Sequence, residues 1–204
     1  MKTITSLTLI LFLSFTHIFA QSNSEIIKAF KTSYTLEKTG SYKKAADELK
    51  KVYSNESYEI NLRLGWLEYN AGLFDESASH YQKALNLKPY SEEAKFGLIY
   101  PKYAQGKWTE VISLYKKILQ INPSNTTANY RLGLIYLGKK DYTAAVNYFE
   151  KVVNLYPFGY DGLLMLAWSD YYLGKTKQAK VLFEKVLMNS PADKSATEGL
   201  KLLK

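Results

Sequence analysis

Residues 64–89 read LGWLEYNAGLFDESASHYQKALNLKP. Apolar residues recur at helical spacing on both sides of Gly72, which predicts two amphipathic helices joined by a tight turn. Proline cannot donate the backbone hydrogen bond that continues a helix, so Pro89 marks the end of the second helix. The stretch therefore predicts a helical hairpin.

The hairpin recurs along the chain with a fixed period. Pro89, Pro123, Pro157 and Pro191 follow one another at intervals of 34 residues. A leucine stands 25 residues before each of these prolines, and an aromatic residue stands eight residues before each. A period of this length is typical of a helical solenoid, in which stacked hairpins bury a core that one hairpin cannot bury alone.

Several repeated columns carry a resemblance to a known family. In residues 58–91 they are Leu64-Gly65, Gly72, Phe74, Tyr81, Ala84-Leu85 and Pro89. This pattern resembles a tetratricopeptide repeat. The resemblance implies an all-α fold, a right-handed α-solenoid of about five hairpins within one domain, residues 21–204. The repeats are expected at about 24–57, 58–91, 92–125, 126–159 and 160–193, with a capping helix at 194–204.

The third repeat departs from the pattern. Ile99 replaces the small residue of the first helix, Gly97 stands two positions early, and Pro101 falls inside that helix. A proline in a helix interior costs about 3 kcal/mol and usually kinks the helix. We therefore expect this helix to be bent or out of register.

The first twenty residues predict a cleavable secretory signal. Met1-Lys2 gives a positive start, Ile4 to Phe15 is an apolar stretch, and Ala20-Gln21 offers a small residue before a polar turn. The apolar run is shorter than the roughly 20 residues that span a bilayer, so no membrane span is expected after cleavage. The prediction is a periplasmic or secreted protein, of a Gram-negative envelope by its signal and its richness in lysine, asparagine and tyrosine.

Composition argues against several classes of function. The net charge is +8, from 27 Lys and Arg against 19 Asp and Glu, but the charges are mixed along the chain, which disfavours nucleic acid as a partner. The chain has no cysteine, and His80 is its one histidine after the predicted signal. Without a nucleophile–base pair or a ligand cluster, we expect no catalytic residue, no metal and no cofactor. His80 is expected on the convex surface.

The first helices also carry a stripe of large apolar residues. Positions 27, 23 and 20 before each proline are spaced as i, i+4 and i+7, so they share one helix face. The family resemblance implies that this face is the concave, partner-binding one. The predicted binding groove consists of Phe30, Tyr34, Leu62, Trp66, Tyr69, Phe96, Tyr100, Tyr103, Tyr130, Leu134, Leu164, Trp168 and Tyr171.

The stripe has two interpretations. It could pack between neighbouring helices, or it could be exposed for binding, which we favour because a separate leucine and small-residue stripe already serves packing. Tyrosine and tryptophan are common in interface hot spots, so the expected partner is another protein or a peptide. Stacking on sugar rings leaves a glycan-binding envelope module as an alternative, and self-association into a structural scaffold is another. The groove lacks the lysines and asparagines of repeats that clamp a terminal carboxylate.

Two smaller features also carry expectations. Arg63 and Arg131 lie in matching Asn-Xaa-Arg-Leu-Gly strings, and each is expected to pair with an acid of a neighbouring repeat. Residues 156–160, YPFGY, form an aromatic loop between repeats. Its rings could staple adjacent repeats together or insert into a partner.

Overall fold

The structure is a computed structural model that describes residues 23–203. All regular secondary structure within this range is helical, so the predicted all-α solenoid class is confirmed. The predicted signal, residues 1–20, lies outside the described residues. The chain divides into two compact units that meet in sequence between Trp108 and Thr109.

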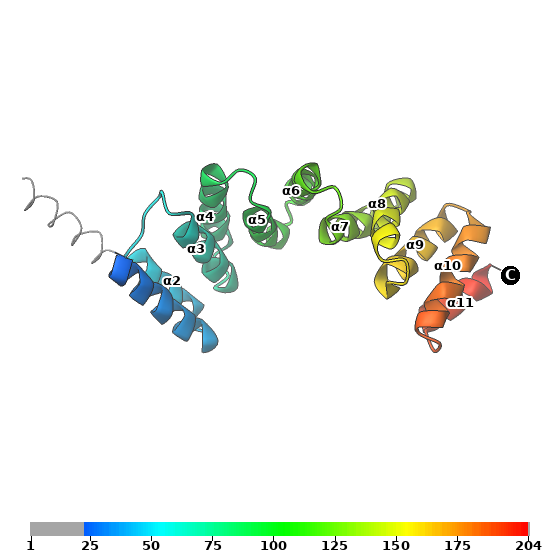
Figure 1. Ribbon diagram of the computed structural model, residues 1–204, viewed down its shortest axis with the longest axis horizontal. Helices are drawn as coiled ribbons and strands as arrows, with labels where there is room; N and C mark the ends of the chain where they lie inside the picture. Colours follow the sequence, from blue (N-terminus) through cyan, green and yellow to red (C-terminus); the bar gives the residue numbers. More distant parts are fainter. Residues whose placement is uncertain (1–22, 204) are drawn as a thin grey trace, which may run out of the picture. The chain divides into compact units, whose positions relative to one another are not determined.

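In the described residues, the N-terminal unit consists of successive helices (Figure 1). A first helix at residues 23–38 is followed by α2 (Tyr42–Lys50), α3 (Tyr58–Asn70), α4 (Phe74–Leu87) and α5 (Glu92–Ala104). Helix α6 (Trp108–Ile121) begins at the last residue of this unit. Successive helices pair as hairpins, α3 with α4, and α4 packs in turn on α5.

The C-terminal unit repeats the same arrangement. After α6 come α7 (Thr126–Gly138), α8 (Tyr142–Leu155), α9 (Tyr160–Tyr172), α10 (Thr176–Asn189) and α11 (Lys194–Leu202). The short α11 packs on α10 and buries Ala196 and Gly199, which closes the last hairpin as a capping helix should.

Short local signals begin and end the helices. Ser57, Ser91, Asn125 and Asp193 each accept a hydrogen bond at the N-terminus of the helix that follows, from the backbone N–H three residues on. Turns within the hairpins place a residue at positive φ, where glycine carries no steric cost. This residue is glycine in four of the turns between helices, whereas Lys140 takes the position between α7 and α8 with φ 61°.

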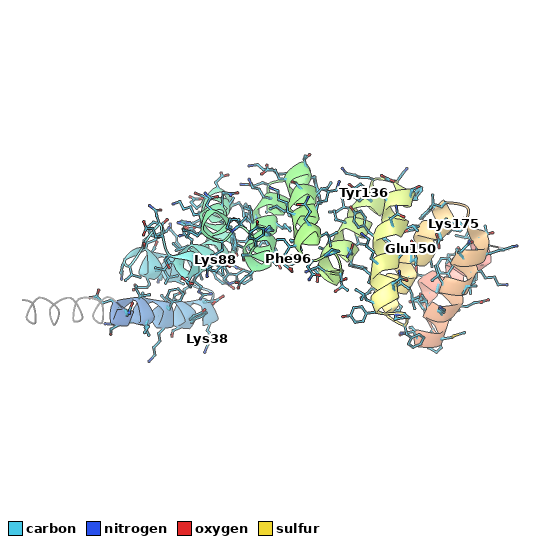
Figure 2. The ribbon with its side chains drawn as sticks, turned by 45° about the horizontal axis from the view of Figure 1, so that its top comes forward. Lys38, Lys88, Phe96, Tyr136, Glu150 and Lys175 are labelled. Carbon is cyan, nitrogen blue, oxygen red and sulfur yellow. The ribbon has the colours of Figure 1, made fainter. Side chains whose placement is uncertain are left out.

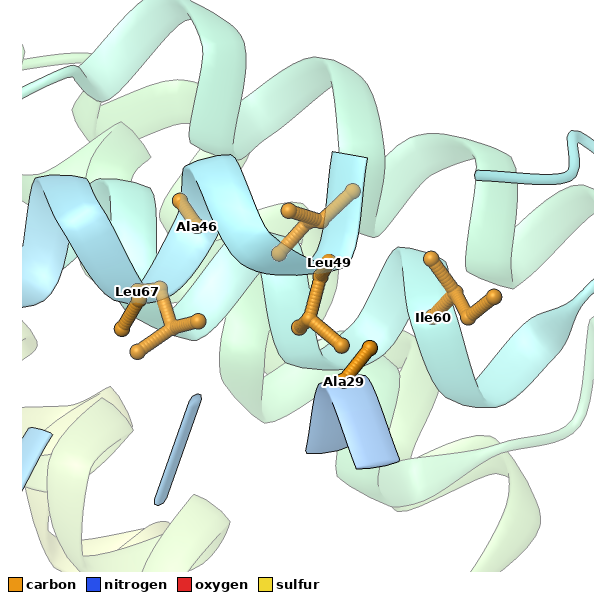
Figure 3. Packing of buried hydrophobic residues seen from close by; sticks show 7 residues of the cluster. Ala29, Ala46, Leu49, Ile60 and Leu67 are labelled. Carbon is orange, nitrogen blue, oxygen red and sulfur yellow. The ribbon is translucent and has the colours of Figure 1, made fainter. Parts of the chain in front are cut away.

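Small residues let the helices of the N-terminal unit approach closely. Figure 3 shows seven buried side chains from the first helix, α2 and α3 that pack together, among them Ala29, Ala46, Leu49, Ile60 and Leu67. Three of the seven are alanines. The leucine and small-residue stripe of the sequence is thus the packing surface of this unit.

Tyr81 of α4 lies between two glycines. A Cβ atom on Gly65 of α3 would stand 2.7 Å from Cδ2 of the buried Tyr81 ring, and one on Gly97 of α5 would stand 2.1 Å from its Cε1. Helices α3 and α5 therefore both contact the Tyr81 ring at a glycine, where the backbone carries no side chain. Gly97, which broke the sequence pattern, is the residue that lets α5 pack on α4.

Helix α5 keeps the register of the repeat. It begins at Glu92, one 34-residue period after Tyr58 begins α3, and runs through Pro101 to Ala104. The expected shift of register is therefore wrong. Pro101 lies in the last turn of α5, where the loss of one backbone donor leaves the rest of the helix hydrogen-bonded.

A buried carboxylate joins three helices of the N-terminal unit. Glu68 of α3 is fully buried, and its Oε2 lies 2.6 Å from His80 Nδ1 of α4. Its Oε1 lies 3.0 Å from the Lys50 ammonium of α2. His80 is therefore mostly buried against Glu68, and the expectation that it lies on the convex surface is wrong. The ring could not be placed from sequence because its partner stands on another helix.

The C-terminal unit is built around two phenylalanine rings. Phe149 of α8 and Phe183 of α10 are fully buried. A Cβ on Gly133 would stand 2.5 Å from Phe149 Cε1, and one on Gly199 would stand 2.3 Å from Phe183 Cζ. Contacts between a buried ring and a glycine therefore recur in both units. No helix within residues 23–203 is both long and apolar enough to cross a bilayer.

Asp170 on α9 is a buried acid whose negative charge is only weakly balanced by a neighbouring cation. Its nearest cation is the Lys175 ammonium, 3.5 Å from Oδ1, and this oxygen accepts no hydrogen bond within the described part of the chain. Burial raises the pKa of Asp170, and the charge of Lys175 opposes the rise only in part. The ionised carboxylate therefore costs stability above that raised pKa.

Asp170→Asn is expected to raise the free energy of unfolding at neutral pH by about 1 kcal/mol, because it removes the buried charge and keeps the shape. When the pKa of a group is higher in the folded state than in the unfolded state, the group stabilises the fold below its unfolded-state pKa. This stabilisation is lost as the pH rises through its folded-state pKa. The gain should thus vanish in acid. Urea unfolding at several pH values measures it, and an equal gain at low pH would contradict this account.

Candidate partner-binding face

The predicted groove residues fall into one stripe on each unit. We call Phe30, Tyr34, Leu62, Trp66, Tyr69, Phe96, Tyr100 and Tyr103 the N-terminal stripe, and Tyr130, Leu134, Leu164, Trp168 and Tyr171 the C-terminal stripe. Members lie on the first helices of the hairpins because positions i, i+4 and i+7 share a helix face. The two stripes differ in exposure and are described in turn.

The N-terminal stripe is a continuous aromatic surface. Trp66 is 36% exposed, and its ring centroid lies 6.4 Å from that of Tyr69 and 6.4 Å from that of Tyr100. Tyr69 and Tyr100 lie 5.4 Å apart, which joins α3 to α5. Tyr34 and Tyr103 are also exposed. These rings therefore offer flat apolar area to solvent from three successive first helices.

Some predicted members contribute less. Four members are only partly exposed, namely Phe30, Leu62, Tyr69 and Phe96, the last labelled in Figure 2. Trp108, the first residue of α6 and not among the predicted groove residues, is 43% exposed and lies edge-on to Tyr103 at 4.8 Å. Sequence analysis missed it because the first residue of a second helix lies beside the hairpin turn, next to the end of the first helix.

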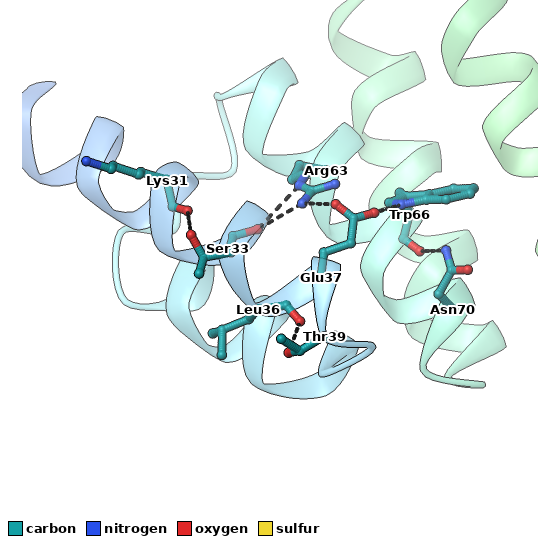
Figure 4. A network of polar contacts seen from close by, with 9 residues as sticks. Lys31, Ser33, Leu36, Glu37, Thr39, Arg63, Trp66 and Asn70 are labelled. Atoms are coloured by element: carbon teal, nitrogen blue, oxygen red, sulfur yellow. Dashed lines mark hydrogen bonds and ion pairs between the residues drawn. The ribbon is translucent and has the colours of Figure 1, made fainter.

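Glu37 holds the N-terminal end of this surface in place. Its carboxylate accepts a hydrogen bond of 2.6 Å from Arg63 Nη2 and another of 2.6 Å from Trp66 Nε1 (Figure 4). Arg63 also donates to Ser33 Oγ, and its guanidinium lies 3.9 Å from the centroid of the Tyr34 ring. Both exposed rings are thus fixed by one buried cation and one carboxylate.

The charges of this network are matched. The hydrogen bond from Arg63 lowers the pKa of Glu37, burial opposes it, and the Trp66 indole adds to the lowering. The prediction that Arg63 pairs with an acid of a neighbouring repeat is confirmed, because Glu37 belongs to the first helix and Arg63 to α3. Arg131, at the equivalent position in α7, is exposed.

The C-terminal stripe is more deeply packed. Trp168 is partly buried, its ring lies 5.1 Å from Phe183 and 5.6 Å from Tyr171, and its Nε1 donates to Ser195 Oγ at 2.9 Å. Tyr130, Leu134 and Tyr171 are partly buried as well. Leu164 is 7% exposed and belongs to the core around Phe183, so it does not line a surface. Neither Trp66 nor Trp168 is sealed inside the protein.

Both stripes offer apolar surface for contact with a partner. Each stripe tryptophan uses its indole N–H within the protein, which leaves only ring faces and edges for a ligand. Among residues 23–203, no group of three or more His, Cys, Asp or Glu side chains could hold a metal ion. The arrangement suits the burial of apolar side chains of a partner.

Stacked hairpins with an exposed aromatic surface are typical of helical-repeat proteins that bind other proteins. Models of the tetratricopeptide repeat match residues 30–92, 126–158 and 161–191. The chain belongs to the tetratricopeptide repeat family. Comparison with curated proteins found no match.

Solved structures share this fold. A crystal structure of MamA is 20% identical, with 81% of this chain and 92% of that chain covered and a TM-score of 0.71. A tetratricopeptide repeat protein from Parabacteroides merdae is 20% identical, with coverage of 88% and 72% and a TM-score of 0.74. YrrB, described as having an unusual peptide-binding site, is 14% identical, with coverage of 92% and 97% and a TM-score of 0.70. At these identities the likeness establishes the fold.

Proposed function

We propose that this protein is a non-catalytic scaffold that binds a partner polypeptide through its aromatic stripes. The observation that carries the proposal is the N-terminal stripe, where Tyr34 and Trp66 are exposed yet held rigid by Glu37 and Arg63. Rigid aromatic side chains lose little entropy on binding, which is why they dominate interface hot spots. The family's general role as an interaction module and the peptide-binding site named for YrrB support the same conclusion.

The partner is expected to present apolar side chains. Trp66 and Trp168 have no free indole donor, and the Arg63 charge is already matched by Glu37. An anionic terminus would therefore find the Arg63 charge already neutralised by Glu37. We further propose an exported location, in the periplasm or outside the cell of a Gram-negative bacterium. The sequence of residues 1–20 supports that location.

Trp66→Ala and Trp168→Ala are each expected to weaken partner binding by about 2 kcal/mol, the hot-spot range. The partner is first captured from envelope extract on the immobilised chain, identified and purified. Calorimetry then measures its affinity for each variant, and circular dichroism checks that helical content is kept. Trp168→Ala needs this check most because its ring supports Phe183.

Tyr90→Ala serves as the matched control, because Tyr90 is an exposed aromatic residue in the loop between α4 and α5, outside the stripe. It should leave affinity unchanged. Equal affinity of the tryptophan variants and the parent would reject the stripe as the binding surface. Loss of binding to purified envelope polysaccharide would favour a glycan-binding module, and a change from dimer to monomer would favour a self-associating scaffold.

A further inference from the structure

Tyrosine side chains join neighbouring hairpins of the C-terminal unit. The Tyr160 hydroxyl, in the 156–160 loop, donates to Asp193 at 2.5 Å and staples the start of α9 to the start of α11. At the junction of the α7–α8 hairpin with the α9–α10 hairpin, two tyrosine rings meet face to face. Tyr142 begins α8, Tyr172 ends α9, and their ring centroids lie 4.9 Å apart with planes inclined by 17°. We call these two residues the junction pair.

The junction pair is close, nearly parallel and open to solvent. Aromatic pairs have ring centroids about 4.5–7 Å apart, and the junction pair lies near the short end of this range. Tyr171 also contacts Tyr172, but edge-on, with ring planes at 69°. Tyr172 is 50% exposed and Tyr142 is partly exposed, so a small molecule in solution can reach the pair.

A second stacked pair of tyrosines differs from the junction pair in its charges. Tyr136 of α7 (Figure 2) and Tyr148 of α8 have centroids 5.6 Å apart and planes inclined by 14°. The Lys116 ammonium lies 5.8 Å from the first ring and the Lys151 ammonium 5.7 Å from the second. Removing an electron from a ring leaves positive charge, which a nearby ammonium opposes. In the part of the chain that the structure describes, no lysine or arginine lies over either ring of the junction pair.

The fold holds the junction pair together and offers no competing thiol. Val146 and Phe149 of α8 share one buried cluster with Leu166 of α9, so the two helices that carry the pair are packed against each other. Groups held in contact in this way react at an effective concentration that free molecules do not reach. Cysteine thiolates are readily oxidised, but the chain has no cysteine, and no disulfide can join its hairpins.

We infer that Tyr142 and Tyr172 are a site of oxidative cross-linking, which a one-electron oxidant, such as the oxidised haem of a peroxidase, converts to dityrosine. Each phenol gives one electron to the oxidant and its hydroxyl proton to water. The two tyrosyl radicals join by a carbon–carbon bond between ring carbons next to the hydroxyl groups. The hydrogen on each bonded carbon then moves to oxygen and restores the phenol. The chain thus loses two electrons and two protons, and the oxidant takes up both electrons.

The new bond joins α8 to α9 and closes the chain between residues 142 and 172 into a loop. A covalent cross-link stabilises a protein mainly by restricting its unfolded chain. The oxidised protein should therefore unfold at a higher urea concentration than the unmodified one. Because the Tyr172 ring also lies 6.0 Å from that of Trp168, the link fixes a neighbour of the C-terminal stripe. The inference does not depend on the proposed partner.

Peptide mapping after oxidation tests the cross-link. The full chain, at low concentration, is treated with light-activated tris(bipyridyl)ruthenium and persulfate, which together act as a small one-electron oxidant. Trypsin cleaves after lysine and arginine, so Tyr142 lies in peptide 141–151, Tyr172 in peptide 152–175 and Tyr136 in peptide 132–139. We expect dityrosine fluorescence and a species that joins 141–151 to 152–175 and lacks the mass of two hydrogen atoms. The link from 132–139 to 141–151 should be about tenfold weaker because of the two ammonium groups.

Phenylalanine variants keep the rings and remove single phenols. Tyr142→Phe and Tyr172→Phe should each lower the yield of the 141–151 to 152–175 link about tenfold, with helical content unchanged by circular dichroism. Tyr148→Phe and Tyr171→Phe, in the same two peptides, are the matched controls and should keep the yield within about twofold. Equal yields in all four variants, or links only between separate chains, would overturn the inference. So would an undiminished yield from the parent unfolded in urea.

Discussion

Gly97→Ala is expected to lower the free energy of unfolding of the N-terminal unit by about 3 kcal/mol, the upper end for overpacking a core. The added methyl would stand 2.1 Å from the Tyr81 ring, which Gly65 confines on its other side. The ring cannot move away, so α4 and α5 must separate. Urea unfolding followed by circular dichroism measures the loss.

Gly138→Ala is the matched control, since Gly138 ends α7 and a Cβ there meets nothing within 4 Å. It should be neutral or slightly stabilising, because alanine favours the helix. Tyr81→Leu should restore part of the stability of Gly97→Ala by making room. Equal effects of alanine at Gly97 and Gly138 would show that the ring contact does not limit packing.

Glu37→Ala is expected to cost about 3 kcal/mol, the lower end for breaking a buried ion pair, because Glu37 keeps some exposure. The substitution leaves the Arg63 guanidinium buried without its carboxylate and frees the Trp66 indole. Partner affinity should fall as well, since Trp66 loses the contact that orients it.

The Glu37 effect should depend on pH. The folded-state pKa of Glu37 is lowered, mainly by Arg63, so its stabilisation is present above the unfolded pKa and is lost as pH falls through the folded one. Parent and Glu37→Ala should therefore converge in acid, as parent and Asp170→Asn should, although the two substitutions change stability in opposite directions at neutral pH. Glu48→Ala, which removes an exposed pair with Lys51, is the control and should change stability little. A pH-independent gap would contradict the ion-pair account.

The hairpins could be predicted because their signals are local. Turn glycines, the period of the prolines and helical spacing suffice to predict the helices, and Pro101 misled the prediction only by suggesting a shift of register. Most side-chain contacts between helices could not be predicted, although the pairing of Arg63 with an acid of the neighbouring repeat was. Nothing in the spacing of Glu68 and His80 tells that they meet, because each has many possible neighbours across the hairpin.

The exposure of the stripes was predictable only in part. Trp66 and Trp168 occupy one column, yet their indoles turn to different partners, Glu37 of the preceding hairpin and Ser195 of the capping helix. Leu164 shares its column with Leu62, but only Leu164 is buried. The position of a residue in the repeat therefore predicts which helix face it occupies. The neighbouring residues decide how much of that face is exposed to solvent.

The ring-and-glycine contact also limits how such a chain can grow by internal duplication. Tyr81 meets Gly97, and one period earlier that column holds Arg63. A tandem copy of residues 58–91 would set an arginine where the ring needs bare backbone. Repeats of this protein are therefore not interchangeable modules, and a viable duplication would have to include the neighbour that complements each ring.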